Sequence, residues 1–121
     1  MNIKSYTDIE QSRKLAEFLS IESADQAYMR IVIAGDNLNI PEEMQYRHNG
    51  NMSVALYSGV GIPCWSLAAL LDILPTGKVL LHDKWNHGYK CICNNIDSYY
   101  FNNPIDACYE MILKLHKLNL L

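Results

Sequence analysis

Residues 63–75 read Pro-Cys-Trp-Ser-Leu-Ala-Ala-Leu-Leu-Asp-Ile-Leu-Pro, and this stretch decides the fold. As a helix it would be apolar around nearly its whole circumference, which leaves no face suited to water. It is too short to cross a bilayer, because a membrane span needs about 20 apolar residues. The stretch therefore predicts a buried central helix, with Pro63 at its first position and Pro75 just beyond its last turn.

Two further helices are expected near the ends of the chain. Residues 7–10, Thr-Asp-Ile-Glu, have the form of a capping box, which predicts a helix near 8–19. In the second helix, Asn103 is the predicted cap, Pro104 the first residue, and Asp106 lies near the positive end. Apolar residues then follow at the spacing of an amphipathic helix: Ile105, Cys108, Met111, Ile112, Leu115 and Leu118.

The middle of the chain predicts strands separated by turns. Residues 28–33 are rich in β-branched and aromatic side chains, which favours a strand, and 52–57 is a second candidate. Residues 35–51 contain several turn signals, so any element within them should be brief.

A second group of strands is predicted between the central and C-terminal helices. Residues 78–85 and 89–93 are typical of a hairpin whose turn ends at Gly88, a glycine that can take a positive φ. The pair Asn94-Asn95 turns the chain again, and 98–101 would be the next strand.

Together these elements predict a single α+β domain over residues 1–121. An antiparallel sheet centred on 78–101, extended by 28–33 and 52–57, would pack against the buried central helix and the amphipathic C-terminal helix. The N-terminal helix would cover a remaining face. A chain of this length buries enough surface to fold without metals or disulfides.

Composition excludes several classes of function. The chain is 50% apolar and 19% charged, as in globular proteins. Its net charge of −3, with no dense Lys/Arg cluster, gives little attraction for a nucleic acid backbone.

The N-terminus lacks the pattern of a signal peptide, so we expect a cytoplasmic protein without membrane contact, whose four cysteines stay reduced. No glycine-rich phosphate loop is present, and we expect no cofactor.

The phrases at 62–71 and 103–111 resemble small uncharacterised proteins encoded by gut Bacteroidetes and their phages or other mobile elements. The resemblance also touches 7–12 and 22–25, and so covers most of the chain in patches. It implies a common fold and an association with mobile elements. No activity is known for that group, so it implies no catalytic residue.

One candidate chemistry is nucleophilic catalysis. Cys64 would lie at the N-terminus of the central helix, where the helix dipole favours a thiolate. His82 or His87 could then serve as the base, with Asp83 orienting it. A cysteine beside a tryptophan at a buried helix start is more often a packing residue, and we favour that interpretation.

A second candidate is a metal site. Cys91 and Cys93 share one face of a predicted strand, and His82 on the neighbouring strand could approach them. Structural zinc usually takes four ligands from Cys-x-x-Cys turns, and this spacing differs. We therefore expect small buried hydrophobic residues and no metal. A small cysteine- or metal-dependent hydrolase is the third of the functions that the sequence leaves open.

The surplus of aromatic residues favours binding instead. Tyr99 and Tyr100 are neighbours on a predicted strand, so their side chains should point to opposite faces, and Trp85 and His87 flank the predicted hairpin turn. Aromatic side chains dominate binding hot spots. The leading hypothesis is a non-catalytic accessory protein of a phage or mobile element that binds a host or element protein, with self-association through an unpaired strand as one form of binding.

The alternative hypothesis is a module that binds or sequesters a small molecule. It would use a pocket between the sheet and residues 35–51, with Trp85, His87 or tyrosines as contacts.

Overall fold

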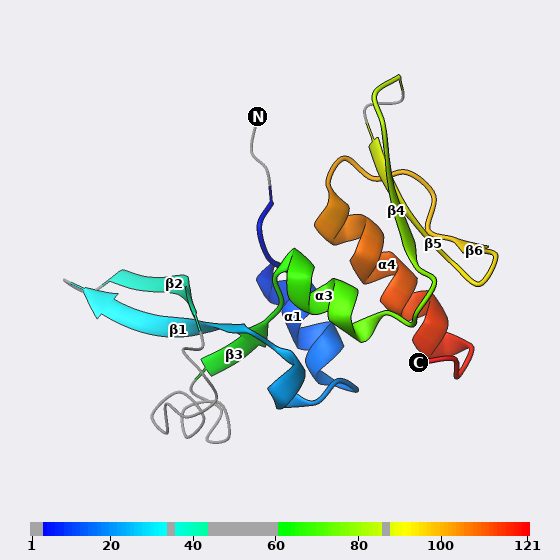
Figure 1. Cartoon of the computed structure of the whole chain (residues 1–121). Helices are drawn as coiled ribbons and strands as arrows, with labels where there is room; N and C mark the ends of the chain where they lie inside the picture. Colours follow the sequence, from blue (N-terminus) through cyan, green and yellow to red (C-terminus); the bar gives the residue numbers. More distant parts are fainter. Residues whose placement is uncertain (1–3, 34–35, 44–60, 86–87) are drawn as a thin grey trace. The chain divides into compact units, whose positions relative to one another are not determined.

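The computed structural model of the chain describes residues 4–33, 36–43, 61–85 and 88–121 (Figure 1). The chain divides into two compact units. We call Asp8–Ser66 the N-terminal unit, and Met1–Thr7 together with Leu67–Leu121 the C-terminal unit. Helices and antiparallel sheets are both present, which confirms the α+β class. The single domain over residues 1–121 stays a prediction.

The N-terminal unit begins with helix α1 (Ile9–Ala16), which starts one residue later than the sequence predicted. Asp8 is the cap: its Oδ1 accepts from the Gln11 N–H at 2.8 Å, and Gln11 Oε1 accepts from the Asp8 N–H at 3.1 Å. The expected pairing of Thr7 with Glu10 was therefore wrong. Asp-x-x-Gln forms the same reciprocal cap, while Thr7 is buried.

The sheet of the N-terminal unit has the order β2-β1-β3, with antiparallel neighbours. β1 (Gln26–Ile33) confirms the strand predicted at 28–33. β2 (Asp36–Glu43) is a correction, because eight residues of strand replace the brief element expected there. Its Pro41 pairs with Tyr28 at the sheet edge, where a missing N–H is tolerated. Residues 52–57 lie outside the described part of the chain.

β3 (Gly61–Cys64) overturns the start predicted for the central helix. Pro63 and Cys64 pair with Ala27 and Gln26 on β1. Two residues beyond the end of the strand, the Ser66 N–H donates to Asp25 Oδ1 at 2.9 Å and the Ser66 hydroxyl donates to Asp25 Oδ2. This contact joins residues far apart in the sequence, so no local spacing reveals it.

The same end of β3 is held by Trp65. Its side chain is fully buried, and its Nε1 donates to Ser23 Oγ at 3.0 Å. Ser23 ends a short 3₁₀ turn at Ile21–Ser23. Strand β3 therefore ends in a polar network that ties it to the segment preceding β1.

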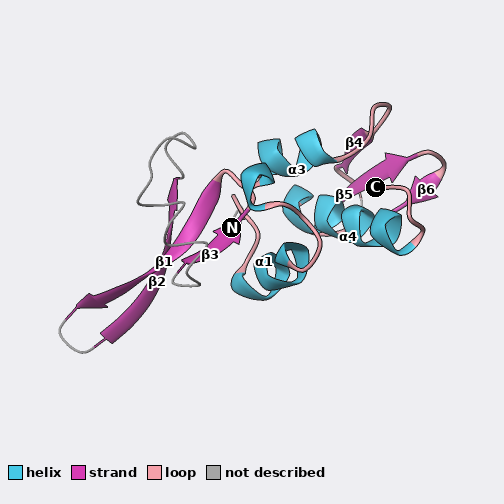
Figure 2. Cartoon of the chain, turned by 90° about the horizontal axis from the view of Figure 1, so that it is seen from below, coloured by secondary structure: helices cyan, strands magenta, loops and turns pink. Residues whose placement is uncertain are grey.

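The described residues of the C-terminal unit form two helices and a sheet of order β4-β5-β6. In chain order its elements are α3 (Leu67–Ile73), β4 (Val79–Asp83), β5 (Gly88–Cys93), β6 (Ile96–Asp97) and α4 (Pro104–Lys117). Helix α4 packs against both β5 and α3 (Figure 2). The single continuous sheet expected from the sequence was wrong, since β1 belongs to the other sheet, where β2 and β3 are its neighbours.

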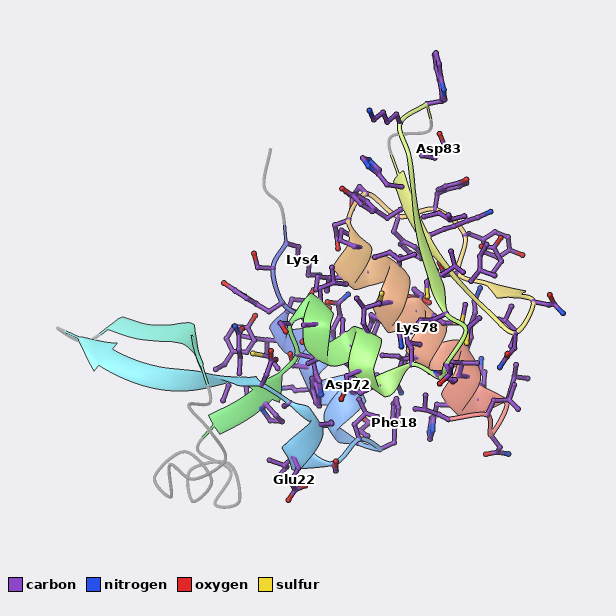
Figure 3. All side chains as sticks on the ribbon, viewed as in Figure 1. Lys4, Phe18, Glu22, Asp72, Lys78 and Asp83 are labelled. Carbon is purple, nitrogen blue, oxygen red and sulfur yellow. The ribbon has the colours of Figure 1, made fainter. Side chains whose placement is uncertain are left out.

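The core of this unit lies between α3, α4 and β5. Leu70 on α3 is fully buried, and Leu74 just after the helix is nearly so, whereas Asp72 is exposed (Figure 3). The central helix is therefore buried on one face, rather than around nearly its whole circumference as the sequence predicted. The other fully buried apolar side chains of the unit's core are Cys91, Cys93, Ile105, Ala107, Cys108, Met111, Ile112 and Leu115.

Helix α4 begins as the sequence predicted. Asn103 Oδ1 accepts from the Asp106 N–H at 2.8 Å, and Pro104 follows the cap. Lys4 Nζ lies 2.8 Å from Asp106 Oδ1, which attaches the N-terminal segment to the start of the helix. Of the predicted apolar stripe, Leu118 is the exception: it lies at the C-terminal cap and is exposed.

The β4–β5 hairpin is confirmed, but Gly88 has another role than the one expected. It pairs with Asp83 inside the strand, and positive φ among the described glycines occurs at Gly77. A Cβ at Gly88 would lie 3.1 Å from Tyr100 Cβ and 3.2 Å from the Phe101 carbonyl oxygen. The absence of a side chain therefore lets another segment approach the Gly88 backbone closely.

The last strand is also shifted. Asn94 and Asn95 have φ of 51° and 67° and form the expected turn, but the strand that follows is β6 at 96–97 rather than 98–101. Tyr99 has φ of 67°, which is incompatible with an extended strand. Phe101 then forms an isolated antiparallel bridge with Tyr89.

Candidate binding surface

Among the described residues of the C-terminal unit, three tryptophan or tyrosine side chains are exposed. Trp85 is 93% exposed, Tyr99 71% and Tyr100 41%. Trp85 lies just beyond β4, and the two tyrosines lie just beyond β6. We call these three residues the aromatic surface. His87, the fourth residue named from the sequence, lies outside the described residues.

Asp83 links Trp85 to Tyr100. Its Oδ1 accepts from the Trp85 N–H at 2.9 Å, and its Oδ2 accepts from the Tyr100 hydroxyl at 3.3 Å. Asp83 lies at the end of β4 far from Lys78 (Figure 3). The Asp83 carboxylate is therefore bonded both to the backbone of Trp85 and to the hydroxyl of Tyr100.

Lys90 on β5 links Tyr100 to Asp97. Its Nζ lies 3.0 Å from Asp97 Oδ2 and 4.9 Å from the centre of the Tyr100 ring. The hydrogen bond to Asp97 raises the pKa of Lys90. The Tyr99 N–H and then Lys90 hold the pKa of Asp97 below its usual range. Both groups therefore stay charged at neutral pH.

Tyr99 is held in place from both sides. Its N–H donates to Asp97 Oδ1 at 2.7 Å. Lys114 Nζ on α4 lies 4.5 Å from the centre of the Tyr99 ring and donates to the Asp97 carbonyl oxygen at 2.8 Å. The left-handed conformation of a bulky L-residue costs roughly 1–2 kcal/mol. The positive φ of Tyr99 therefore lowers the stability of the fold, while most of its ring remains exposed.

Ser98 fixes the backbone between the two tyrosines and β5. Its hydroxyl accepts from the Cys91 N–H at 2.9 Å and donates to the Tyr99 carbonyl oxygen at 2.8 Å. Sequence reasoning missed Asp83, Lys90, Asp97, Ser98 and Lys114 as supports of the aromatic surface. The one local signal was Asp97-Ser98-Tyr99, since an aspartate often bonds the backbone N–H two residues on.

The structure does not support Cys64 as an activated nucleophile. It lies on β3 rather than at a helix N-terminus, and its side chain is fully buried. Burial, with a further contribution from the charge of Asp25, raises the pKa of the Cys64 thiol to about 12. His82 and Asp83, the residues considered as its base and orienter, belong to the other unit. At neutral pH Cys64 is a protonated thiol.

Cys91 and Cys93 are buried, as expected for packing residues, and share the face of β5 that meets α4. The Cys91 and Cys108 thiols are hydrogen-bonded, and this contact together with burial raises the pKa of Cys108. Burial likewise raises the pKa of Cys93. His82 stacks on Tyr89, with ring centres 4.2 Å apart. Among the described residues, no group of three or more His, Cys, Asp or Glu side chains could hold a metal ion.

The pocket of the small-molecule hypothesis involves residues 44–51 and His87, which lie outside the described residues, so that hypothesis stays a prediction. In the parts of the chain described, no helix combines the length and apolar character needed to span a bilayer. No family model matches the chain, and no curated protein or solved structure shows a significant similarity to it.

Proposed function

We propose that this protein acts by binding another protein, and that the aromatic surface of Trp85, Tyr99 and Tyr100 is the contact. The exposure of Trp85 is the observation that carries the proposal. Nearly the whole indole faces water, so it forgoes the roughly 1.5–3 kcal/mol that burying a large apolar side chain provides. A partner that covers the indole would recover this free energy, and tryptophan and tyrosine are enriched in binding hot spots.

The strained conformation of Tyr99 supports the same proposal. Its φ of 67° is costly for a tyrosine, yet most of its ring is exposed. Folding therefore gains little from a tyrosine here in return for the strain. Strain of this kind at an exposed position is typical of residues that contact a ligand.

The supporting charges suit a protein partner. Two carboxylates, Asp83 and Asp97, alternate with two ammonium groups, Lys90 and Lys114, between and beside the aromatic rings. The surface thus joins apolar rings to charges of both signs, as in the polar rim that surrounds interface hot spots. It lacks the excess of positive charge that a nucleic acid would require.

In this proposal the chain is a non-catalytic accessory protein of a phage or mobile element that acts in the bacterial cytoplasm on a host or element protein. This setting rests on the resemblance of residues 62–71 and 103–111 to proteins of gut Bacteroidetes and their mobile elements. The choice of contact surface rests on the exposed aromatic residues.

Site-specific photo-crosslinking tests the proposal. A photoreactive phenylalanine analogue replaces Trp85 in the chain expressed in a gut Bacteroidetes cell, and a matched variant carries it at Arg13, an exposed position on α1. We expect a discrete protein adduct, identified by mass spectrometry, from position 85 and not from position 13. Adding Tyr99→Asn should weaken it.

Equal adducts from both positions, or none from position 85, would contradict the proposal. Native mass spectrometry of the purified chain tests the alternative at the same time. A retained small molecule that is lost on Trp85→Ala would favour the small-molecule hypothesis.

A further inference from the structure

Strand β4 forms one edge of its sheet. In the described part of the chain it pairs with β5. On the far side of β5, Tyr89 and Phe101 exchange both main-chain hydrogen bonds, at 2.7 and 2.8 Å. The N–H and C=O of Tyr89 therefore point away from β4. Because these groups alternate in direction along a strand, it is Lys90 that bonds toward β4, and its partner there is Leu81.

The alternation leaves Leu80 and His82 with their N–H and C=O groups pointing outward. No hydrogen bond among the described residues uses these four groups. Their spacing is that of an antiparallel ladder. An unpaired row of this kind is a template for another strand.

The side chains of β4 do little to block such pairing. Val79 is 46% exposed and Leu81 is 40% exposed. Both side chains lie on one face of the sheet, and the Cys91 side chain lies on the other face. Edge strands are usually protected by a lysine, a proline or a bulge within the strand. Here three apolar residues, Val79, Leu80 and Leu81, stand in a row before the first charge at Asp83.

We propose that β4 pairs antiparallel with β4 of a second copy of this chain, so that the two sheets become one. An antiparallel edge contact between identical strands has two-fold symmetry, so both copies contribute the same groups and the assembly closes as a dimer. A second copy therefore supplies acceptors for the outward N–H groups of this edge and donors for its outward C=O groups.

The side chains select the register of the pair. With Leu80 opposite Leu80 of the second copy, each Val79 lies opposite a Leu81, and the overlap is apolar at its centre. Apolar pairs directly opposite one another stabilise a sheet. The neighbouring register, centred on Leu81, would set Val79 opposite Asp83 and Lys78 opposite Lys84, and like charges in that position are destabilising.

The contact is small. Five residues from each copy bury well under the roughly 1,000 Å² expected of a stable interface, so the dimer should be weak and its population should rise with concentration. This proposal does not depend on the binding of a partner at the aromatic surface. Each can fail without the other.

Sedimentation equilibrium of the full chain over about a hundredfold range of concentration tests the pairing by mass action. The decisive variant is His82→Pro, which removes an outward N–H and leaves the β4–β5 hydrogen bonds of Leu81 intact. Its matched control is His82→Ala, which loses the same stacking on Tyr89 but keeps the N–H. Wild type and His82→Ala should increase in average mass with concentration, whereas His82→Pro should remain monomeric.

A wild-type chain that is monomeric throughout would overturn the proposal, as would association of His82→Pro equal to that of His82→Ala. Should His82→Pro fail to fold, Leu81→Lys replaces it, because a lysine is tolerated at this exposed position. The new lysine would place a charged side chain opposite Val79 of the second copy. Leu81→Lys should also remain monomeric, and undiminished association would contradict the pairing.

Discussion

At the level of single residues, substitutions at Tyr99 test whether its positive φ costs stability while its exposed ring contributes little to folding. Asparagine adopts the left-handed region more easily than other non-glycine residues, whereas a β-branched residue does so at high cost. Tyr99→Asn should therefore have a free energy of unfolding within about 1 kcal/mol of wild type, while Tyr99→Val should lose roughly 1–2 kcal/mol or more. Urea denaturation measures both. Equal losses in the two variants would contradict the backbone assignment at this residue.

Asp97 gives a pH dependence with a definite sign. The Tyr99 N–H and Lys90 lower its pKa in the folded state, so its charge stabilises the fold above the ordinary carboxyl pKa of about 4. This stabilisation is lost as pH falls through the lowered pKa. Asp97→Asn can still accept from the Tyr99 N–H but cannot pair with Lys90 as an ion.

Urea unfolding from pH 7 to pH 2 checks the sign. Wild type should be more stable than Asp97→Asn at neutral pH, and the difference should disappear in acid. A difference that persists unchanged at the acid end would show that the charge of Asp97 is not its cause.

At the scale of elements, α3 shows what local patterns can predict. The apolar run correctly predicted a helix that packs in the core, because helical spacing and hydrophobicity are properties of the segment itself. Its predicted start was wrong by four residues, because Pro63 and Cys64 pair with β1 as part of β3, and Ser66, the residue before α3, is hydrogen-bonded to Asp25. Both interactions join residues far apart in sequence.

The C-terminal helix shows the opposite case. Its cap, first proline and first-turn aspartate are neighbours in sequence, and all three were predicted and found. The sequence predicts only a brief element within 35–51 because Pro41 is one of the turn signals there, although Leu38 and Ile40 alternate with asparagines as in a strand. An edge position, which is a property of the whole sheet, is what makes that proline acceptable.

The packing of α3 gives a prediction at this scale. Leu70 is fully buried, whereas Leu71 is partly exposed. Leu70→Ala should lower the free energy of unfolding by roughly 2–5 kcal/mol, and Leu71→Ala should lower it less. Thermal and urea denaturation of the two variants check the order. A larger loss at Leu71 than at Leu70 would mean that the helix packs through a different face.

At the scale of the whole molecule, the residue types of the candidate site were predictable and their support was not. The sequence analysis names Trp85 as an aromatic residue beside a predicted hairpin turn, and Tyr99 and Tyr100 as aromatic residues of a predicted strand. The contacts that position them join β4, β5, β6 and α4 through Asp83, Lys90, Asp97 and Lys114. Such contacts depend on strand register and on how the helix packs, so they emerge once the C-terminal unit is assembled.

The proposed binding surface depends on the exposure of Trp85, in contrast to Trp65, the other tryptophan of the chain, which is fully buried. Iodide quenching of tryptophan fluorescence tests it directly, with Trp85→Phe as the comparison. We expect the wild-type protein to show a readily quenched component that disappears in Trp85→Phe, leaving the protected emission of Trp65. A readily quenched component that survives in Trp85→Phe, or none in the wild type, would contradict the claim.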